Sequence, residues 1–233
     1  MNIKNHPRLL DLFCCAGGAA VGYARAGFEV VGVDIASQKN YPFEFHQGDA
    51  LAYVAEHGHE FDAIHASPPC QHYSTLTKGN RGRGEQRDHP DLITATRDAL
   101  NATGKPYVIE NVTSAPIRAD ATLCGLMFDL KVFRHRIFEV HGWTTTTPEH
   151  PPHKGHRVAG WRHGQHHDGD MFAVYGNGGG KGTIEQWQTA MGITHTRDRR
   201  ELAEAIPPAF TEHLGKQLMA HLGLGVARVP TVG

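Results

Sequence analysis

The sequence predicts an α/β protein built on a Rossmann-like, doubly wound, mostly parallel sheet with helices on both faces, plus a small irregular insertion. Short apolar runs alternate with helix-like segments through the first half of the 233 residues, which is typical of βαβ units. In addition, a turn of small residues at 14–18 separates the first apolar run from the first helical segment. Because ligands of such sheets bind at the carboxyl ends of the strands, we expect the functional residues there.

Each element has a local signal in the sequence. The apolar run 8–13 (RLLDLF) predicts the first strand, and the segment 17–26 predicts a helix that ends at Gly27. Further apolar runs predict strands at 28–34, 61–66 and 107–111. Further helices are expected at about 90–102, with Asp88 or His89 near the cap, at 184–191, and at 200–222 with an interruption at Pro207 and Pro208.

Composition changes between residues 142 and 182, where Pro, His and Gly dominate and only 171–175 (MFAVY) predicts a strand. We therefore divide the chain into three parts. Residues 1–141 form a cofactor-binding and catalytic core, 142–195 form a reduced recognition region or insertion, and 196–233 supply C-terminal helices that complete the core.

Composition also indicates a soluble protein. The length and the 39% hydrophobic content allow one well-packed core. The four cysteines, two of them adjacent, do not form a disulfide pattern and are expected to be reduced thiols. The N-terminus lacks the apolar core of a signal peptide, and no apolar run approaches the roughly 18 residues of a membrane span. We therefore expect a cytoplasmic protein that does not associate with a membrane.

The formal net charge of −1 does not by itself indicate a nucleic-acid partner, so any basic surface must be local. Residues 78–87 (KGNRGRGEQR) hold four basic side chains against one acid, and residues 131–167 hold six Lys or Arg and eight His against two Glu. Either segment could contact phosphate groups or be a solvated loop. The residues that we expect to bind nucleic acid are Lys78, Arg81, Arg83 and Arg87.

The turn after the first strand, in DLFCCAGGAAVG, has the features of a nucleotide-binding loop. Gly17 and Gly18 allow a ligand to approach the backbone, and the following helix offers free N–H groups. Asp34 ends the second strand, where a carboxylate can accept hydrogen bonds from a ribose, and Asp49 could meet an adenine. The turn does not match GxGxxG, so an adenosyl ligand without pyrophosphate fits as well as a dinucleotide. A plain tight turn is the alternative.

Cys70 lies in ASPPCQHYS, where two prolines restrict the backbone after the expected strand 61–66. A thiolate at a strand end can act as a nucleophile if its surroundings are positive or donate hydrogen bonds. Glu110 ends the strand 107–111, so a nucleophile and an acid are expected to share one pocket. The alternative for Cys70 alone is a small buried hydrophobic residue.

PPCQ at 68–71, the triplet ENV at 110–112 and the DLF–GG turn together resemble the cytosine C5 DNA methyltransferases, which use S-adenosylmethionine. FRHRIFE around Arg134 and Arg136 looks like the family's RxR element, with both arginines on one face of a strand. ELAEAIPP at 201–208 looks like the late motif that closes the cofactor site. The resemblance omits about 142–195, so the chain looks like a short member with a reduced target recognition region.

The resemblance implies how the cofactor S-adenosylmethionine is bound, its product being S-adenosylhomocysteine. Phe13 would stack on the adenine, Gly17 and Gly18 would admit the methionine part, and Asp34 would bind the ribose. Two further residues matched to the cofactor site are Asp49 and Pro68. The chain departs from the family at Cys15, where the first motif usually has Gly.

The resemblance also implies the catalytic roles. The thiolate of Cys70 would add to C6 of cytosine, which makes C5 nucleophilic enough to accept the methyl group. Glu110 would contact N3 and the 4-amino group, and a partly dry pocket would raise its affinity for a proton. Arg134 and Arg136 would hold the base carbonyl and position the catalytic loop.

The substrate stays open at this point. Duplex DNA with a flipped cytosine is the first reading. The same reaction on a free cytosine nucleotide, CMP or dCMP, would need no recognition domain and is the second. A catalytically idle DNA-binding or decoy protein is the third.

We expect no metal. Six histidines could bind one, but no CxxC accompanies them: His150, His153, His156, His163, His166 and His167. Cys124 and the Cys14–Cys15 pair are expected to be packed small residues.

Overall fold

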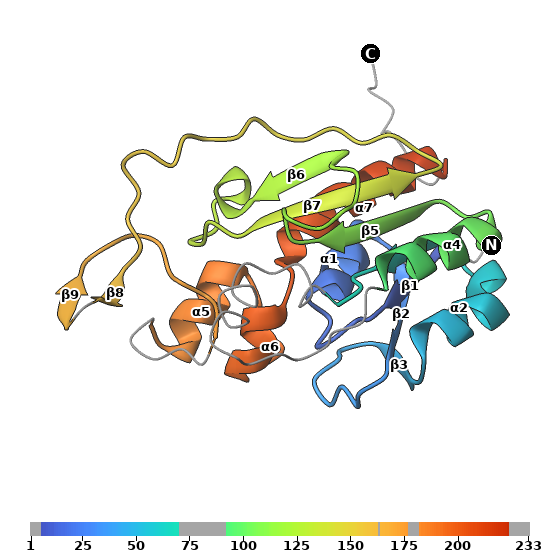
Figure 1. The fold of residues 1–233 in the computed structure, drawn as a ribbon, viewed down its shortest axis with the longest axis horizontal. Coiled ribbons are helices and arrows are strands. Elements are labelled where there is room, and N and C mark those ends of the chain that lie inside the picture. Colours follow the sequence, from blue (N-terminus) through green and yellow to red (C-terminus); the bar gives the residue numbers. More distant parts are fainter. Residues whose placement is uncertain (1–5, 70–91, 163, 177–181, 224–233) are drawn as a thin grey trace, which may run out of the picture.

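The computed structural model describes residues 6–69, 92–162, 164–176 and 182–223, and a seven-stranded sheet forms its centre (Figure 1). The strand order is β3-β2-β1-β4-β5-β7-β6, and β7 runs antiparallel to both of its neighbours. The strands are β1 (Arg8–Leu12), β2 (Glu29–Asp34), β3 (Glu44–Gln47), β4 (Ala63–Ala66), β5 (Tyr107–Asn111), β6 (Ala121–Cys124) and β7 (His135–His141). The predicted mostly parallel α/β sheet is therefore confirmed.

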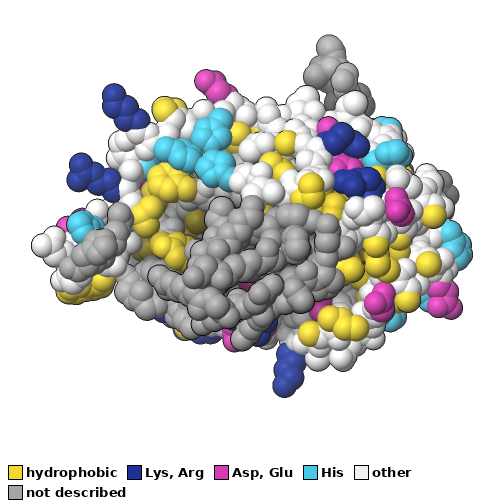
Figure 2. Space-filling model, in the orientation of Figure 1, with side chains coloured by type: hydrophobic (Ala, Val, Ile, Leu, Met, Phe, Trp, Pro, Cys, Tyr) yellow, Lys and Arg dark blue, Asp and Glu magenta, His cyan; other side chains and the backbone are white. Residues whose placement is uncertain are grey.

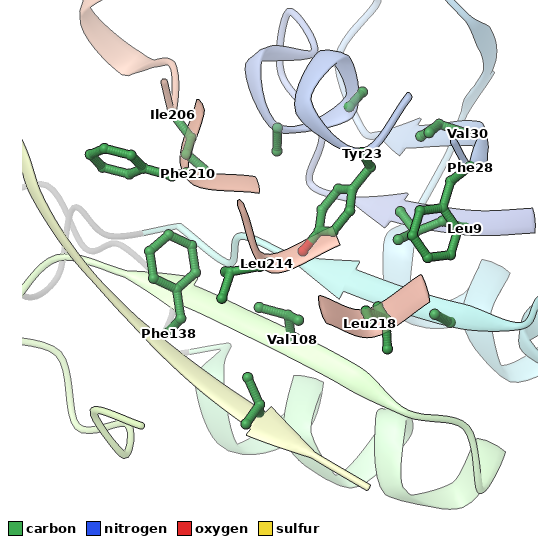
Figure 3. Close-up of a cluster of buried hydrophobic side chains, with 14 of the residues drawn as sticks. Leu9, Tyr23, Phe28, Val30, Val108, Phe138, Ile206, Phe210, Leu214 and Leu218 are labelled. Carbon is green, nitrogen blue, oxygen red and sulfur yellow. The ribbon is translucent and has the colours of Figure 1, made fainter. Parts of the chain in front are cut away.

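Helices cover both faces of this sheet because successive strand side chains point to opposite sides. Leu9 of β1 packs in one hydrophobic cluster with α1 (Gly18–Ala26) and α7 (Pro208–His221). Leu10 packs in a second cluster with α2 (Ala50–His57) and α4 (Ile93–Thr103). Figure 3 shows the first cluster, in which Tyr23 lies among side chains of the sheet and of α7. These two clusters make the three-layer sandwich that the strand and helix alternation predicts.

The C-terminal helix closes onto the first one. The hydroxyl of Thr211 in α7 donates a hydrogen bond to the carbonyl of Ala19 in α1, 2.8 Å away and fully buried. Pro208 occupies the first turn of α7, where its missing N–H costs nothing. The predicted helical region 200–222 is thus two helices, α6 (Arg199–Glu204) and α7, separated near the predicted prolines.

A third hydrophobic cluster joins α5 (Ile184–Met191) and α6 to the chain before β7. Trp187, Met191 and Leu202 are fully buried there, and Val132 and Val174 are nearly so. The predicted strand at 171–175 is wrong. Met171 forms only an isolated bridge to Val158, and Phe172 donates its N–H to the carbonyl of Lys131, so this apolar run is used in packing and not in a ladder.

The remaining elements are short. The sequence did not predict the hairpin of β8 (Gly160–Arg162) and β9 (Gln165–His167), nor the 3₁₀ helices η1 (Gly58–Glu60) and η2 (Gly125–Phe128). Asp88 and His89, either of which was expected near the cap of the helix at about 90–102, lie outside the described residues. That helix, α4, begins at Ile93 after Leu92. In the described part of the chain, no helix combines the length and apolar character needed to cross a membrane.

A buried ion pair fixes α4 to the antiparallel strand. The carboxylate of Glu139 in β7 is fully buried and accepts two hydrogen bonds from Arg97, of 2.8 and 2.9 Å. It also accepts the backbone N–H of Arg118 at 3.0 Å. Burial raises the pKa of Glu139, but these hydrogen bonds outweigh it and hold the pKa below its ordinary value. The carboxylate therefore stabilises the folded protein at neutral pH.

Glu139→Gln is expected to lower the free energy of unfolding by about 3 kcal/mol, because it leaves Arg97 without its counter-charge. Urea unfolding monitored by circular dichroism measures this. Because the folded pKa is lowered, the difference from wild type should shrink as pH falls through that pKa. The control Glu185→Gln removes an exposed ion pair to Arg197 and should leave the urea midpoint nearly unchanged. Equal effects of both changes would contradict this role for Glu139.

Candidate active site

The carboxyl ends of four parallel strands lie side by side. The register pairs Leu12 with Val33 and with Ala66, and pairs Ala66 with Ile109. The residues that follow these positions are therefore brought to one edge of the sheet. They include four residues named in the sequence analysis: Phe13, Asp34, Pro68 and Glu110.

The turn after β1 is strained. Phe13 and Cys15 have positive φ angles of 57° and 45°, which side-chain-bearing residues rarely adopt. Asp34 holds this conformation because its Oδ2 accepts the N–H of Cys15 at 3.0 Å and its Oδ1 accepts the N–H of Ala36 at 2.9 Å. Each carboxylate oxygen retains a second lone pair for a ligand. Strain of this kind is characteristic of binding loops.

Two glycines let distant segments close around this turn. A Cβ on Gly18 would lie 2.5 Å from the carbonyl oxygen of Ile206, and a Cβ on Gly17 would lie 2.9 Å from side-chain atoms of Tyr41 and Pro42. The segment between α6 and α7 therefore packs directly against the start of α1. This is the part of the chain that resembles the family's late motif.

Asp11, inside β1, is an ionisable residue that the sequence did not single out. It is fully buried, and the hydroxyl of Tyr41 donates to its Oδ2 at 3.4 Å. Burial, aided by the nearby charge of Asp34, raises the pKa of Asp11 to about 8. Its Oδ1 has no hydrogen-bond partner among the residues that the structure describes. A buried acceptor without a partner, next to the turn, is a feature of a site that awaits a ligand.

Glu110 is the central carboxyl group of the site. It is buried at the end of β5, and Nε of Arg136 lies 2.8 Å from its Oε1. This ion pair and a hydrogen bond with Ser67 fix the orientation of the carboxyl group. Burial raises the pKa of Glu110, although Arg136, Arg134 and a hydrogen bond with Ser67 oppose the shift. The carboxyl group is thus held in place, more easily protonated than an exposed Glu, and still able to bind a substrate atom.

A buried hydrogen-bond chain supports Glu110 from behind. The hydroxyl of Tyr23 lies 3.0 Å from Nδ1 of His65, and Nε2 of His65 lies 2.9 Å from Oγ of Ser67, which contacts Glu110. Burial lowers the pKa of His65 to about 3, so this imidazole is neutral. His65 and Ser67 were not predicted as functional residues from the sequence. A histidine within an otherwise apolar strand was the available signal.

Asn111 links β5 to the segment after β4. Its Nδ2 donates a buried hydrogen bond of 3.0 Å to the carbonyl of Pro68, and its Oδ1 accepts the N–H of Val112 at 2.9 Å. This places the Ser67–Pro69 segment beside Glu110. Cys70 follows it in the chain but lies outside the described residues, as do Lys78, Arg81, Arg83 and Arg87.

The two arginines of FRHRIFE contact different groups. Arg136 lies on β7 and pairs with Glu110, whereas Arg134 precedes the strand, so the expectation that both lie on it is corrected. The guanidinium of Arg134 donates to the carbonyls of Val174 and Ala203, each at 2.7 Å, and to that of Ala205. Arg134 therefore ties the start of β7 to the segment that closes on Gly18.

Two residues lie at the adenine end of the expected cofactor site. Asp49 is exposed and caps α2, because its Oδ1 accepts the N–H groups of Leu51 and Ala52 at 2.8 and 2.9 Å. Ile35, directly after Asp34, has 72% of its surface exposed. The sequence analysis missed Ile35, for which the signal was an apolar residue in the polar segment after β2. An exposed apolar side chain at this point can pack against a flat ring.

The chain is similar to known methyltransferases in sequence and in fold. Residues 7–115 match the family model described as C-5 cytosine-specific DNA methylase. The chain is 27% identical over 139 residues to "Type II methyltransferase M.HgiDI" of Herpetosiphon aurantiacus, covering 52% of this chain and 42% of that protein. It is 28% identical over 124 residues to "Type II methyltransferase M.HgiGI" of the same organism, covering 46% and 92%. The chain thus spans less than half the length of the first relative.

A solved structure, the Entamoeba histolytica methyltransferase EhMeth, has a TM-score of 0.65 and 12% identity, and the match covers 94% of this chain and 99% of that one. This likeness shows a common fold.

Proposed function

We propose that the chain belongs to the C-5 cytosine-specific DNA methylase family, whose model matches residues 7–115, and that it methylates C5 of cytosine in DNA. The observation that carries the proposal is the state of Glu110. It is buried, hydrogen-bonded with Ser67, and paired with Arg136, whose Nε lies 2.8 Å from Oε1. Its neighbour Asn111 fixes the segment that leads to Cys70.

In the proposed reaction, the thiolate of Cys70 forms a bond to C6 of cytosine, and the electron pair of the C5–C6 bond moves toward N3 and C5. Glu110 shares its proton with N3, which neutralises the developing charge. C5 would then take up the methyl group, whose former bonding electrons would stay with the sulfur of the donor, and N3 would return its proton to Glu110. The C5 proton leaves to solvent, its electron pair restores the C5–C6 double bond, and the Cys70 thiolate is expelled.

S-adenosylmethionine supplies an electrophilic methyl group on a positively charged sulfur. The residues of this chain fit such a ligand, because the turn after β1 is enclosed by other segments and borders the unpartnered Oδ1 of Asp11. Asp34 would bind the ribose hydroxyls, and the negative charge of this carboxylate suits a cation. Phe13 and Ile35 would lie against the adenine, with Gly17 and Gly18 beside the methionine part.

Asp49 and Pro68 are assigned smaller parts in this proposal. Oδ1 of Asp49 already accepts two N–H groups of α2, so Asp49 would contact the adenine edge through its other carboxylate oxygen. Pro68 is buried, and its carbonyl is already bound to Asn111, so its ring would form a wall of the pocket. Arg136 would stay with Glu110 and the base, whereas Arg134 acts as a positioning residue.

The substrate is decided by a methyl-transfer assay. The whole chain is incubated with methyl-labelled S-adenosylmethionine and duplex DNA, CMP or dCMP, and the products are digested and identified by mass spectrometry. We expect 5-methylcytosine in DNA and none on the mononucleotides. Methylation of mononucleotides alone would reject DNA as the substrate, and no transfer to any of the three would favour an idle DNA-binding protein.

DNA binding itself has a separate signature. Lys78, Arg81, Arg83 and Arg87 are proposed to contact phosphates, and each contact adds a slope of about −0.9 to log K against log salt. A mononucleotide ligand would respond weakly to salt. The steepness of the salt dependence therefore separates the two substrates without an activity measurement.

Asn111→Ala is expected to lower kcat about 10- to 100-fold, because freeing the Pro68 carbonyl lets the nucleophile segment move by about an ångström. The hydrogen bond of Asn111 reaches Pro68 but not the turn after β1 or Asp34, so the Kd for S-adenosylmethionine should rise much less than kcat falls. Single-turnover methylation and calorimetric titration measure the two quantities. A fall in cofactor affinity equal to the fall in rate would contradict a positioning role.

A further inference from the structure

Four side chains with metal-binding atoms meet at the edge of the sheet, away from Glu110. Cys124 is the last residue of β6, His135 is the first of β7, and the two are direct partners in the antiparallel register. His150 and His153 come from the HPPH sequence in the segment after β7. One ligand atom from each residue lies within 4.8 Å of all the others.

Two of the distances between these atoms match those of a tetrahedral site. Sγ of Cys124 lies 3.4 Å from Nε2 of His153, and Nε2 of His135 lies 3.3 Å from Nε2 of His150. With zinc bonds of about 2.0 Å to nitrogen and 2.3 Å to sulfur, neighbouring ligand atoms of a tetrahedron lie about 3.3–3.6 Å apart. The two closest pairs therefore already have the spacing that a bound zinc ion requires.

The surroundings favour a metal over a purely hydrogen-bonded cluster. Each neutral imidazole offers one donor and one acceptor, and here three imidazoles and a thiol turn toward one point. The ring centroids of the three histidines lie 5.0 to 5.5 Å from one another. A hydrogen bond between the His135 ring and the backbone of Phe133 orients that imidazole, as second-shell contacts do in metal sites.

The exposure of the cluster to solvent and the rigidity of its backbone also suit a metal site. Cys124 is fully buried, His135 and His153 are half-buried, and His150 is exposed, so the cluster opens to solvent on one side. Figure 2 shows histidine side chains gathered on the face above β6 and β7. The two prolines between His150 and His153 restrict the backbone and reduce the entropy lost on binding.

We propose that Cys124, His135, His150 and His153 bind one Zn²⁺ in a closed, structural site. One thiolate and three imidazoles suit zinc, and four protein ligands leave no open coordination position. This proposal replaces the expectations of no metal and of a merely packed Cys124. His156 is not part of the site because its Nδ1 binds Asp170, and His166 and His167 lie on β9.

A bound zinc ion would hold the segment after β7 in place. Zinc would attach that segment to the edge of the sheet, where β6 has a neighbour on one side only. It would also fix His135, whose next residue, Arg136, reaches Glu110. The proposal does not depend on the proposed methylation, because metal binding is measured without substrate.

The test measures zinc in the whole chain, expressed with zinc in the medium and then desalted, by inductively coupled plasma mass spectrometry. Wild type and the control His156→Ala should each hold about one zinc per chain. The double variant His150→Ala/His153→Ala should bind at least about tenfold more weakly, since even second-shell losses cost that much. Cobalt(II) provides a second readout, because a thiolate ligand gives a near-ultraviolet charge-transfer band.

Cys124→Ser should lose that charge-transfer band. Wild-type protein without zinc and without the cobalt band overturns the proposal, and this result does not depend on whether any variant folds. Equal zinc in wild type and the double variant places the metal elsewhere and also overturns it. Binding of a different metal to the four residues would overturn the assignment to zinc.

Discussion

Cys70→Ala is expected to reduce methyl transfer to DNA by more than about a thousandfold, the scale on which loss of a covalent nucleophile acts. Without the thiolate, no bond forms at C6, and C5 of an aromatic cytosine is too weak a nucleophile to accept the methyl group. Single-turnover incorporation of labelled methyl measures the rate.

The same variant should still bind S-adenosylmethionine with wild-type affinity, because the turn after β1, Asp34 and the Ile206 segment are unchanged. Calorimetric titration provides this control. A Cys70→Ala protein that methylates DNA at a rate within tenfold of wild type would show that the chemistry does not proceed through this thiol.

Glu110→Gln is expected to lower the rate by about 10²- to 10⁴-fold, the usual contribution of a positioned acid. The amide has almost the same shape as the carboxyl group and can still contact the base, but it cannot share a proton with N3. The change therefore removes one chemical property of Glu110 and leaves its volume.

The pH dependence separates this role from a structural one. Burial raises the pKa of Glu110, so the proton needed at N3 is present below that raised pKa and is lost as pH rises through it. The methylation rate of wild type should therefore fall as pH rises through this pKa, and this alkaline limb of the pH profile should be absent in Glu110→Gln. Glu139→Gln is the matched control, since Glu139 is also buried on the sheet but has a lowered pKa. An unchanged alkaline limb in Glu110→Gln would contradict the assignment.

The parallel strands of the sheet could be predicted because local signals in the sequence mark where each strand ends. β2 ends at Asp34 and β5 at Asn111, directly after Glu110, where the sequence analysis placed them. The first helix ends at Gly27, whose φ of 110° is a conformation that glycine adopts readily. Apolar runs of four to six residues separated by helical segments indicated parallel strands, but the pairing of β1 with β4, which are not consecutive in the chain, had no local signal.

Other features depend on contacts between distant parts of the chain and have weak local signals. The apolar run at 171–175 reads as a strand, but it packs on the cluster around Trp187, which lies later in the sequence. Cys124 and His135 become neighbours only because β7 runs antiparallel to β6. Asp11 reads as one residue of an apolar strand, and its burial beside Tyr41 follows from the loop after β2.

The residues of the candidate site also fall into two groups, those that the sequence predicted and those that only the structure identified. Asp34, Glu110 and Arg136 were identified because the family motifs name them and strand ends collect them. His65 and Ser67 were not, and Asn111 was noted only as a member of the ENV triplet, because the importance of all three lies in hydrogen bonds to other elements. Supporting residues of this kind need the fold before their partners can be known.

The most direct measurement uses a DNA duplex in which one cytosine carries fluorine at C5. After methyl transfer, the fluorine cannot leave as a proton does, so the enzyme stays attached to the base through sulfur. The expected result is a stable protein–DNA adduct that forms only with S-adenosylmethionine and whose peptide mass places the bond on Cys70. Methylation of ordinary DNA by a protein that forms no such adduct, or forms it on another residue, would contradict the account.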